Sequence, residues 1–156
     1  MRKRSKYRPK GVRLNTMGYV TEGLTPVTQH ESFAIDLRLT NHLAMDTLTK
    51  GKATKKDIDV LIGLVNVTEA LCVLGFGAEY EQIMEDGLAS LRSLGSRGLA
   101  QGKFILRAEE MHALNAVLEL HDAQLDVITV KDMERALLLV KEVMRNKRAT
   151  PIKETP

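Results

Sequence analysis

Aromatic side chains and cysteine are scarce in this sequence, and tryptophan is absent. Aromatic residues make up 4% of the 156 residues, whereas apolar residues of all kinds make up 44%. A hydrophobic core must therefore be built from Leu, Val, Ile, Met and Ala, and the chain is long enough for one such domain. The one cysteine, Cys72, excludes an intramolecular disulfide and is typical of a protein in a reducing cytosol. We interpret Cys72 as a small core side chain rather than a nucleophile.

Recognisable catalytic motifs are also missing. The sequence contains no nucleophile elbow, no Walker loop, no dinucleotide-binding glycine pattern and no CxxC pair. The segment Gly75-Phe76-Gly77 follows a predicted helix rather than a strand, so we do not interpret its glycines as a phosphate loop. We therefore expect no catalytic residues, no cofactor and no enzymatic activity.

Long apolar runs are absent, although residues 54–74 come close to one. A membrane-spanning helix needs about 20 predominantly apolar residues, and Asn66, Thr68 and Glu69 interrupt this stretch. The basic N-terminus is not followed by the apolar region of a secretory signal. We therefore expect no membrane contact and a cytoplasmic location.

Residues 54–74 instead predict a helix that is buried on nearly every side. Thr54 and Asp57 have the spacing of an N-terminal capping box. Past the first turn, apolar residues cover the helix except for a narrow stripe of polar or small residues, and neighbouring elements enclose a helix of this kind. Within the stripe, Gly63 and Ala70 would let a second helix approach closely, from the same chain or from another subunit. We favour a homo-oligomer.

Hydrophobic periodicity predicts four further helices, at residues 28–51, about 78–96, about 107–126 and 129–146. On the first of them, Ile35, Leu39 and Leu43 are assigned to the buried face. After the helix predicted at about 78–96, Gly95, Gly98 and Gly102 are expected to form a loose loop. The predicted fold is all-α, a bundle of four to five helices around the buried central helix. Its parts are an extended basic N-terminal arm (1–27), a helical domain (28–148) and a flexible C-terminal tail (149–156).

Positive charge is concentrated at the N-terminus. Residues 1–13 carry seven Lys or Arg and no acid, and residues 141–156 carry a net +3, so the total of +3 leaves −7 for residues 14–140. A basic segment with an aromatic residue suits contacts with the phosphates of DNA or RNA. Docking of the arm on the acidic body or on a sister subunit is the alternative. The predicted nucleic-acid-binding residues are Arg2, Lys3, Arg4, Lys6, Tyr7, Arg8, Lys10 and Arg13.

A polar stripe follows the helix predicted at 107–126. His112, Asn115, Glu119, Asp122 and Asp126 fall within about 80° of one another on a helical wheel. Glu109 and His112 have the spacing used in di-iron bundles, but a second Glu-x-x-His is missing. We therefore predict no metal site, and the stripe faces either solvent or another subunit.

His121 belongs to the apolar face of the same helix. It lies between Leu118 and Leu125 in the periodic pattern, which favours a core histidine over a ligand. Its neighbours Asp122 and Gln124 are expected to point elsewhere.

Two segments of the chain resemble known sequences. The opening RKRSKYRPKGV (2–12) and the run ELHDAQLDVITVKDMERAL (119–137) resemble small proteins encoded by tailed bacteriophages and prophages of Gram-negative bacteria. The resemblance implies a phage accessory protein of the bacterial cytoplasm, a class whose members commonly bind host factors, defence components or nucleic acid. It implies no activity and no site residues for this chain.

Together these observations predict a non-enzymatic binding protein, with an oligomeric helical body and an arm that contacts nucleic acid. The alternative is an inhibitor of a host or defence protein that presents Glu119, Asp122 and Asp126 to a basic partner surface. A variant of that alternative is a sponge that holds a small nucleotide signal between subunits.

Overall fold

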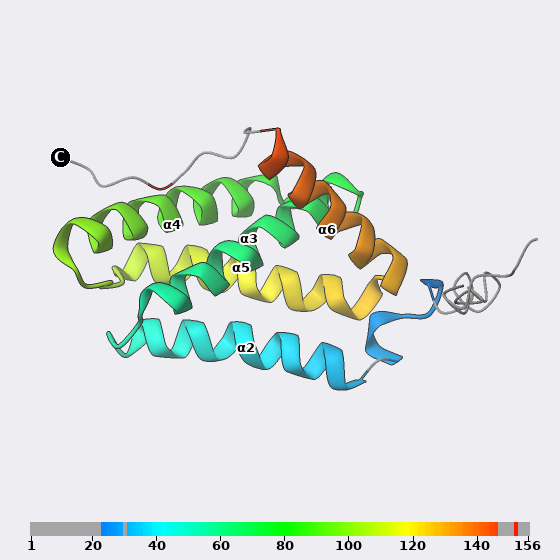
Figure 1. The fold of residues 1–156 in the computed structure, drawn as a ribbon, viewed down its shortest axis with the longest axis horizontal. Coiled ribbons are helices and arrows are strands. Elements are labelled where there is room, and N and C mark those ends of the chain that lie inside the picture. The colour runs from blue at the N-terminus through cyan, green and yellow to red at the C-terminus, as the bar shows by residue number, and fades with distance from the viewer. Residues whose placement is uncertain (1–22, 30, 147–151, 153–156) are drawn as a thin grey trace, which may run out of the picture.

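The computed structural model describes residues 23–29, 31–146 and 152, and these form an all-helical fold without strands. The predicted fold class is confirmed. The α-helices are α2 (Glu31–Thr49), α3 (Lys55–Val73), α4 (Glu81–Gln101), α5 (Ala108–Val127) and α6 (Val130–Arg145), and the two short 3-10 helices are η1 (Val27–Gln29) and η2 (Ala78–Tyr80) (Figure 1).

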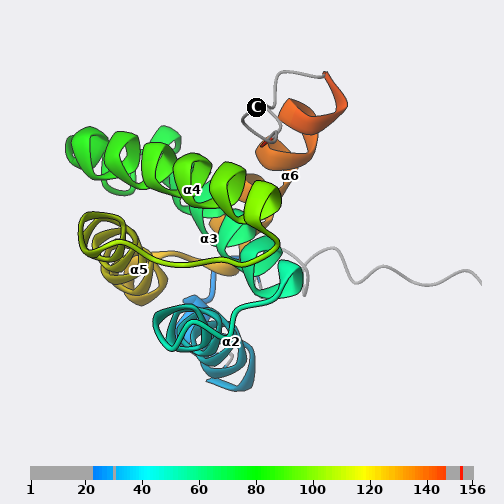
Figure 2. The ribbon, with the colours of Figure 1, turned by 90° about the vertical axis from the view of Figure 1, so that its left-hand side faces the viewer.

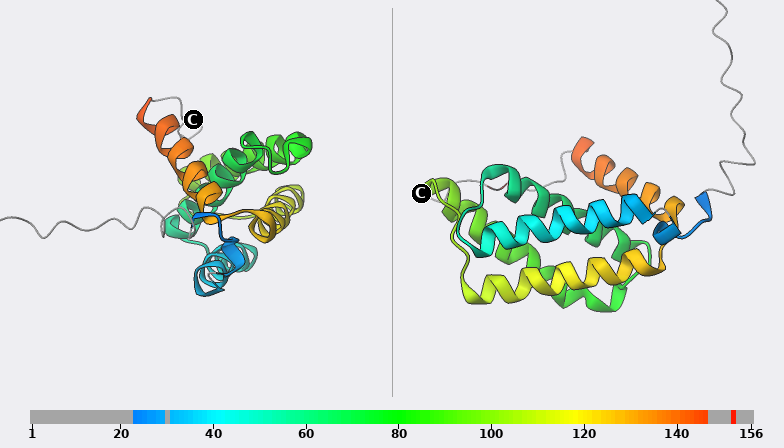
Figure 3. Two further views of the ribbon diagram at one scale, coloured as in Figure 1. Left: turned by 90° about the vertical axis from the view of Figure 1, so that its right-hand side faces the viewer. Right: turned by 90° about the horizontal axis from the view of Figure 1, so that it is seen from below.

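Helix α3 is the centre of the bundle, as its all-round apolar pattern predicts. It packs against α2, α4, α5 and α6. Seen from the end in Figure 2, α2, α4 and α5 lie on one side of α3 and α6 lies on the other. In the view from below in Figure 3, α2 and α5 run side by side. The buried residues of α3 are Ile58, Leu61, Leu64, Val65, Thr68, Ala70 and Leu71.

The ends of α3 follow local sequence signals. At its start, the Thr54 N–H donates to Asp57 Oδ2 at 2.7 Å, so the predicted capping contact is present. At its end, Gly75 has φ 100° and the amide of Phe76 reaches back to the carbonyl of Leu71 at 2.9 Å. A positive φ at this position favours glycine because it has no Cβ.

The apolar core has two parts. The larger lies among α2, α3, α4 and α5 and includes Leu48, Leu61, Leu94 and Leu114. The smaller joins α6 to the ends of α3 and α5 through Leu71, Leu125, Ile128 and Met133, among others. The backbone also fixes this junction, because the Val27 N–H donates to Ile128 O and the Val130 N–H donates to Thr25 O, both at 3.0 Å.

Helix α4 is longer than the sequence pattern predicts. The expected loose loop begins only at Gly102, because the helix continues through Gly95 and Gly98. A Cβ placed on Gly98 would stand 2.0 Å from Phe104 Cδ1, and one on Gly95 would stand 2.8 Å from Ile152 Cγ2. The two glycines therefore serve close packing rather than chain flexibility, which corrects the prediction.

The buried face of α2 is also narrower than predicted. Ile35, Leu39 and Leu43 were assigned to the core, but each is 53–54% exposed. Their i, i+4, i+8 spacing places them together along the outer side of the helix. They form an apolar stripe on the surface, defined here as the α2 stripe.

A partly buried ion pair joins α4 to the start of α5. The Arg97 guanidinium donates to both oxygens of Glu110, at 2.9 Å and 2.6 Å, and to Ile105 O at 2.8 Å. The Arg107 N–H donates to Glu110 Oε2 at 2.9 Å, which caps the helix. Burial alone would raise the pKa of Glu110, but the hydrogen bonds from Arg97 and Arg107 outweigh it and lower the pKa on balance.

No helix in the described ranges is both long and apolar enough to cross a membrane. This agrees with the expectation for residues 54–74.

Candidate functional site

The predicted nucleic-acid-binding residues lie outside the part of the chain that the structure describes. They are Arg2, Lys3, Arg4, Lys6, Tyr7, Arg8, Lys10 and Arg13. Their role therefore stays a prediction. The described chain begins at Gly23, whose position for a Cβ is 3.6 Å from Lys131 Cβ on α6.

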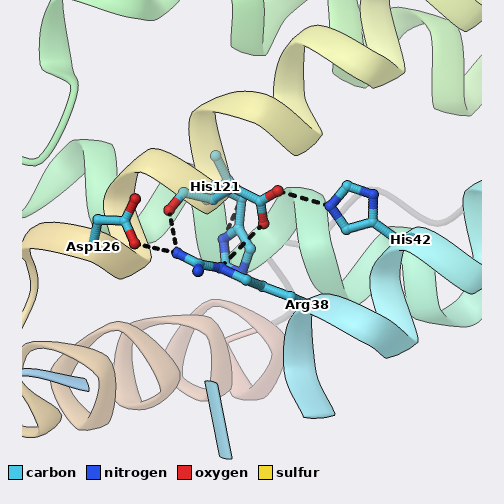
Figure 4. Close-up of polar contacts among 6 residues, drawn as sticks. Arg38, His42, His121 and Asp126 are labelled. Carbon is cyan, nitrogen blue, oxygen red and sulfur yellow. Dashed lines mark hydrogen bonds and ion pairs between the residues drawn. The ribbon is translucent and has the colours of Figure 1, made fainter. Parts of the chain in front are cut away.

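Two of the three predicted acidic-face residues are engaged within the fold (Figure 4). Arg38 of α2 forms an ion pair with Asp126 and donates to the backbone oxygen of Asp122 at 3.0 Å. Its Nε lies 3.7 Å from Asp122 Oδ1, and His42 Nε2 lies 2.7 Å from Asp122 Oδ2. Glu119 is exposed. The predicted stripe on α5 therefore partly faces α2 and its negative charge is partly neutralised there.

Sequence reasoning missed Arg38. Its partners are 84 and 88 positions away, so no local periodicity connects them. One signal was available, because Arg38 is the only Lys or Arg in residues 31–49. A lone cation on a helix that packs against an acidic helix has a ready set of partners.

His121 is buried, as predicted. Its exposed fraction is 1%, and its Nδ1 is 3.2 Å from Thr68 Oγ1. Since Thr68 Oγ1 donates its hydrogen to Leu64 O at 2.7 Å, it accepts from His121, and Nδ1 carries the proton of the neutral ring. Among the described protein atoms, Nε2 has no hydrogen-bond partner. Burial lowers the pKa of His121 to about 4, against 6.5 for the free side chain.

Gln124 is buried beside His121, contrary to the expectation that it points elsewhere. Its amide donates to Phe76 O at 2.8 Å, in the turn after α3, and to Thr68 O at 3.2 Å, within α3. It also lies 3.4 Å from Cys72 Sγ. Burial raises the pKa of the Cys72 thiol, which disfavours the reactive thiolate and agrees with a packing role.

The lowered pKa of His121 predicts a pH-dependent stability. Because the unfolded chain takes up this proton more readily, the full contribution of the neutral ring is present above about pH 6.5. It is lost progressively as the pH falls from about 6.5 towards 4, by up to about 3 kcal/mol. The measurement is the free energy of unfolding in urea between pH 4 and 7.5. His121→Gln should have a flatter profile than the wild type across this range.

His112→Gln is the matched control for this prediction, because His112 is exposed on the same helix. It should retain the wild-type pH profile. Equal profiles for His121→Gln and the wild type would contradict the assignment of the slope to His121.

The Glu109-x-x-His112 spacing is not joined by further metal-ligating side chains in the described part of the chain. Glu109 and His112 are both exposed, and the described residues contain no group of three or more His, Cys, Asp or Glu side chains that could hold a metal ion. Chemically, the contacts of Arg38 with Asp122 and Asp126 are an ion-pair network that ties α2 to α5.

A groove lies between α3, α4 and α6, with a volume of about 670 Å³. This lies within the range of about 300–1,000 Å³ that is common for ligand sites. Its apolar wall includes Ile58, Ile62, Leu88, Leu91, Leu99, Phe104, Val140, Val143, Met144 and Ile152, and its charged and polar lining consists of Lys55, Asp59, Asn66, Glu69 and Arg92. The polar residues of the stripe predicted on the central helix, Asp59 and Asn66, thus line this groove.

The chain is therefore an all-helical protein with an ion-pair network on one side of α3 and an apolar groove on the other. Comparison with known proteins gives no match to a protein-family model, to a curated protein or to a solved structure.

Proposed function

We propose that this chain is a non-enzymatic binding protein that contacts nucleic acid through its N-terminal arm. The observation that carries the proposal is the density of charge, seven Lys or Arg and no acid within residues 1–13. Nucleic-acid affinity grows with the number of phosphates that such residues neutralise. The acidic residues of the body would oppose phosphate, which favours the arm as the contact.

The origin and assembly of the protein form part of the same proposal. The resemblance of residues 2–12 and 119–137 supports an accessory protein of a phage or prophage that acts in the bacterial cytoplasm. The exposed α2 stripe, Ile35, Leu39 and Leu43, supports self-association, because exposed apolar rows on a helix are typical of protein contacts. An oligomer would present several arms to one nucleic acid and raise the overall affinity.

The test is a variant in which Arg2, Lys3, Arg4 and Lys6 are replaced by alanine. Binding to labelled duplex and single-stranded DNA and RNA is measured at low and high salt. We expect weaker binding and a smaller salt dependence, because four of seven phosphate contacts are lost. For duplex DNA the slope of log K against log salt should become shallower, from about −6 to about −3. Unchanged binding by this variant would rule out the arm as the contact.

The alternative proposal is an inhibitor of a host or defence protein, or a sponge for a nucleotide signal, that acts through the acidic helical body. The contacts of Arg38 with Asp122 and Asp126 support it less well, because they place a positive charge beside two of the three carboxylates. Within the described residues, Glu119 is exposed and, unlike Asp122 and Asp126, forms no ion pair.

A further inference from the structure

The groove between α3, α4 and α6 already holds one side chain from outside these helices. Ile152 lies beyond the end of α6, yet it packs against the larger apolar core and lines the groove. Its Cγ2 and Cδ1 atoms stand 2.8 Å and 3.0 Å from the position of a Cβ on Gly95. The groove thus accommodates an aliphatic side chain that is not part of any helix of the bundle.

Gly95 is the feature that makes room for Ile152. Glycine inside a helix costs about 1 kcal/mol relative to alanine, and Gly95 is buried within α4. Any side chain at position 95 would push Ile152 away. One turn further along the helix, Gly98 makes the same kind of space for Phe104, so the two glycines form a flat surface that receives apolar side chains.

The groove extends well beyond the contact with Ile152. Its lining along α3 runs from Lys55 to Val73, which corresponds to about 27 Å of helix. The charges in the lining are balanced, with Lys55 and Arg92 against Asp59 and Glu69. Apolar contact rather than net charge therefore selects what binds. Ile152 is the only large aliphatic residue in the segment 147–156, so this segment offers the groove a single apolar anchor.

We propose that this groove is a binding site for short peptide segments that carry an aliphatic side chain, and that Ile152 of the same chain occupies its Gly95 end in the absence of such a segment. Ile152 is then an internal competitor for the site. This proposal does not depend on nucleic-acid binding by the arm. It gives the helical body a partner of defined chemistry, a polypeptide segment with an exposed Ile, Leu or Val.

The test uses the full chain and a fluorescently labelled peptide with the sequence of residues 146–156, observed by fluorescence anisotropy. The Ile152→Ser protein should bind the peptide because its Gly95 end is free. The wild-type protein should bind it at least about ten-fold more weakly, because a tethered competitor acts at an effective concentration in the millimolar range. A peptide in which the isoleucine is replaced by serine should not bind to either protein.

Two further variants locate the binding. In the Ile152→Ser background, Gly95→Leu should abolish peptide binding, since the leucine fills the position of Ile152. Gly63→Leu is the matched control on α3, where an added Cβ meets nothing within 4 Å, and it should leave binding intact. Circular dichroism and a thermal melt establish that each variant is folded.

Three results would overturn the proposal. The first is a folded Ile152→Ser protein that does not bind the peptide, including one that forms dimers instead, which would place a second copy in the groove. The second is equal binding by the wild type and Ile152→Ser. The third is binding that does not depend on the isoleucine of the peptide, which would indicate a non-specific apolar surface.

Discussion

Glu110→Gln should destabilise the protein by about 3 kcal/mol. The substitution keeps the size of the side chain but leaves the Arg97 guanidinium without its carboxylate, and Arg97 is only 16% exposed. Removing one partner of a buried ion pair typically costs about 3–5 kcal/mol because the other charge stays poorly solvated. We take the lower end because Arg97 retains some contact with water. The measurement is the free energy of unfolding in urea at neutral pH.

Glu109→Gln provides the control for this experiment. Glu109 is the preceding residue, it lies in the same first turn of α5, and it is exposed. Both variants remove one negative charge from the helix N-terminus, so the difference between them reports the contacts that only Glu110 makes, chiefly with Arg97 and also with the Arg107 N–H. Glu109→Gln should change stability by no more than about 0.5–1 kcal/mol. Equal losses for the two variants would show that the Arg97 contact contributes little.

Acid should weaken the same contact. The pKa of Glu110 in the folded protein is lowered from its usual 4.5. A carboxylate of this kind stabilises the fold above its unfolded pKa, and the contribution is lost as the pH falls through the folded pKa. This loss occurs at lower pH than most of the loss assigned to His121, so the two effects are separable in a pH series.

Gly98→Ala should destabilise the protein by about 1–3 kcal/mol, although alanine is the better helix former. A Cβ at this position would stand 2.0 Å from the ring of Phe104, which is buried. Either the ring or the helix must move, and overpacking of this kind typically costs more than the gain in helix propensity. The measurement is the midpoint of urea unfolding at constant slope.

Gly63→Ala is the matched substitution with the opposite expected sign. Gly63 is exposed within α3, and an added Cβ meets nothing within 4 Å. Alanine should stabilise the protein there by about 0.5–1 kcal/mol. If Gly98→Ala also stabilised the protein, the close approach of Phe104 to α4 would be contradicted.

The central helix could be predicted because its evidence is local. Burial on all sides is a property of one apolar pattern, and Thr54 with Asp57 marks its start within three residues. The end of α4 could not be predicted in the same way. The sequence shows Gly95 and Gly98, but not that Ile152 and Phe104 lie opposite them.

The Arg38 contacts and the groove depend on packing between helices that are far apart in the sequence. The sequence pattern could therefore not predict them. Arg38 meets its partners only because α2 and α5 lie side by side. The groove exists because α6 packs on α3 at a distance from α4, which no periodicity in α6 encodes. The exposure of the α2 stripe could not be predicted either, because its apolar pattern fits a buried helix face equally well.

The most direct test of the proposed function is the salt dependence of binding to duplex DNA and to RNA, for the full chain and for a chain that begins at Leu14. The account predicts binding at low salt, with a slope of log K against log salt approaching about −6 on duplex DNA if all seven cations contact phosphates. It also predicts that removal of the arm abolishes this binding. An absence of binding at low salt, or a slope that is unchanged without residues 1–13, would contradict the proposal that the arm binds nucleic acid.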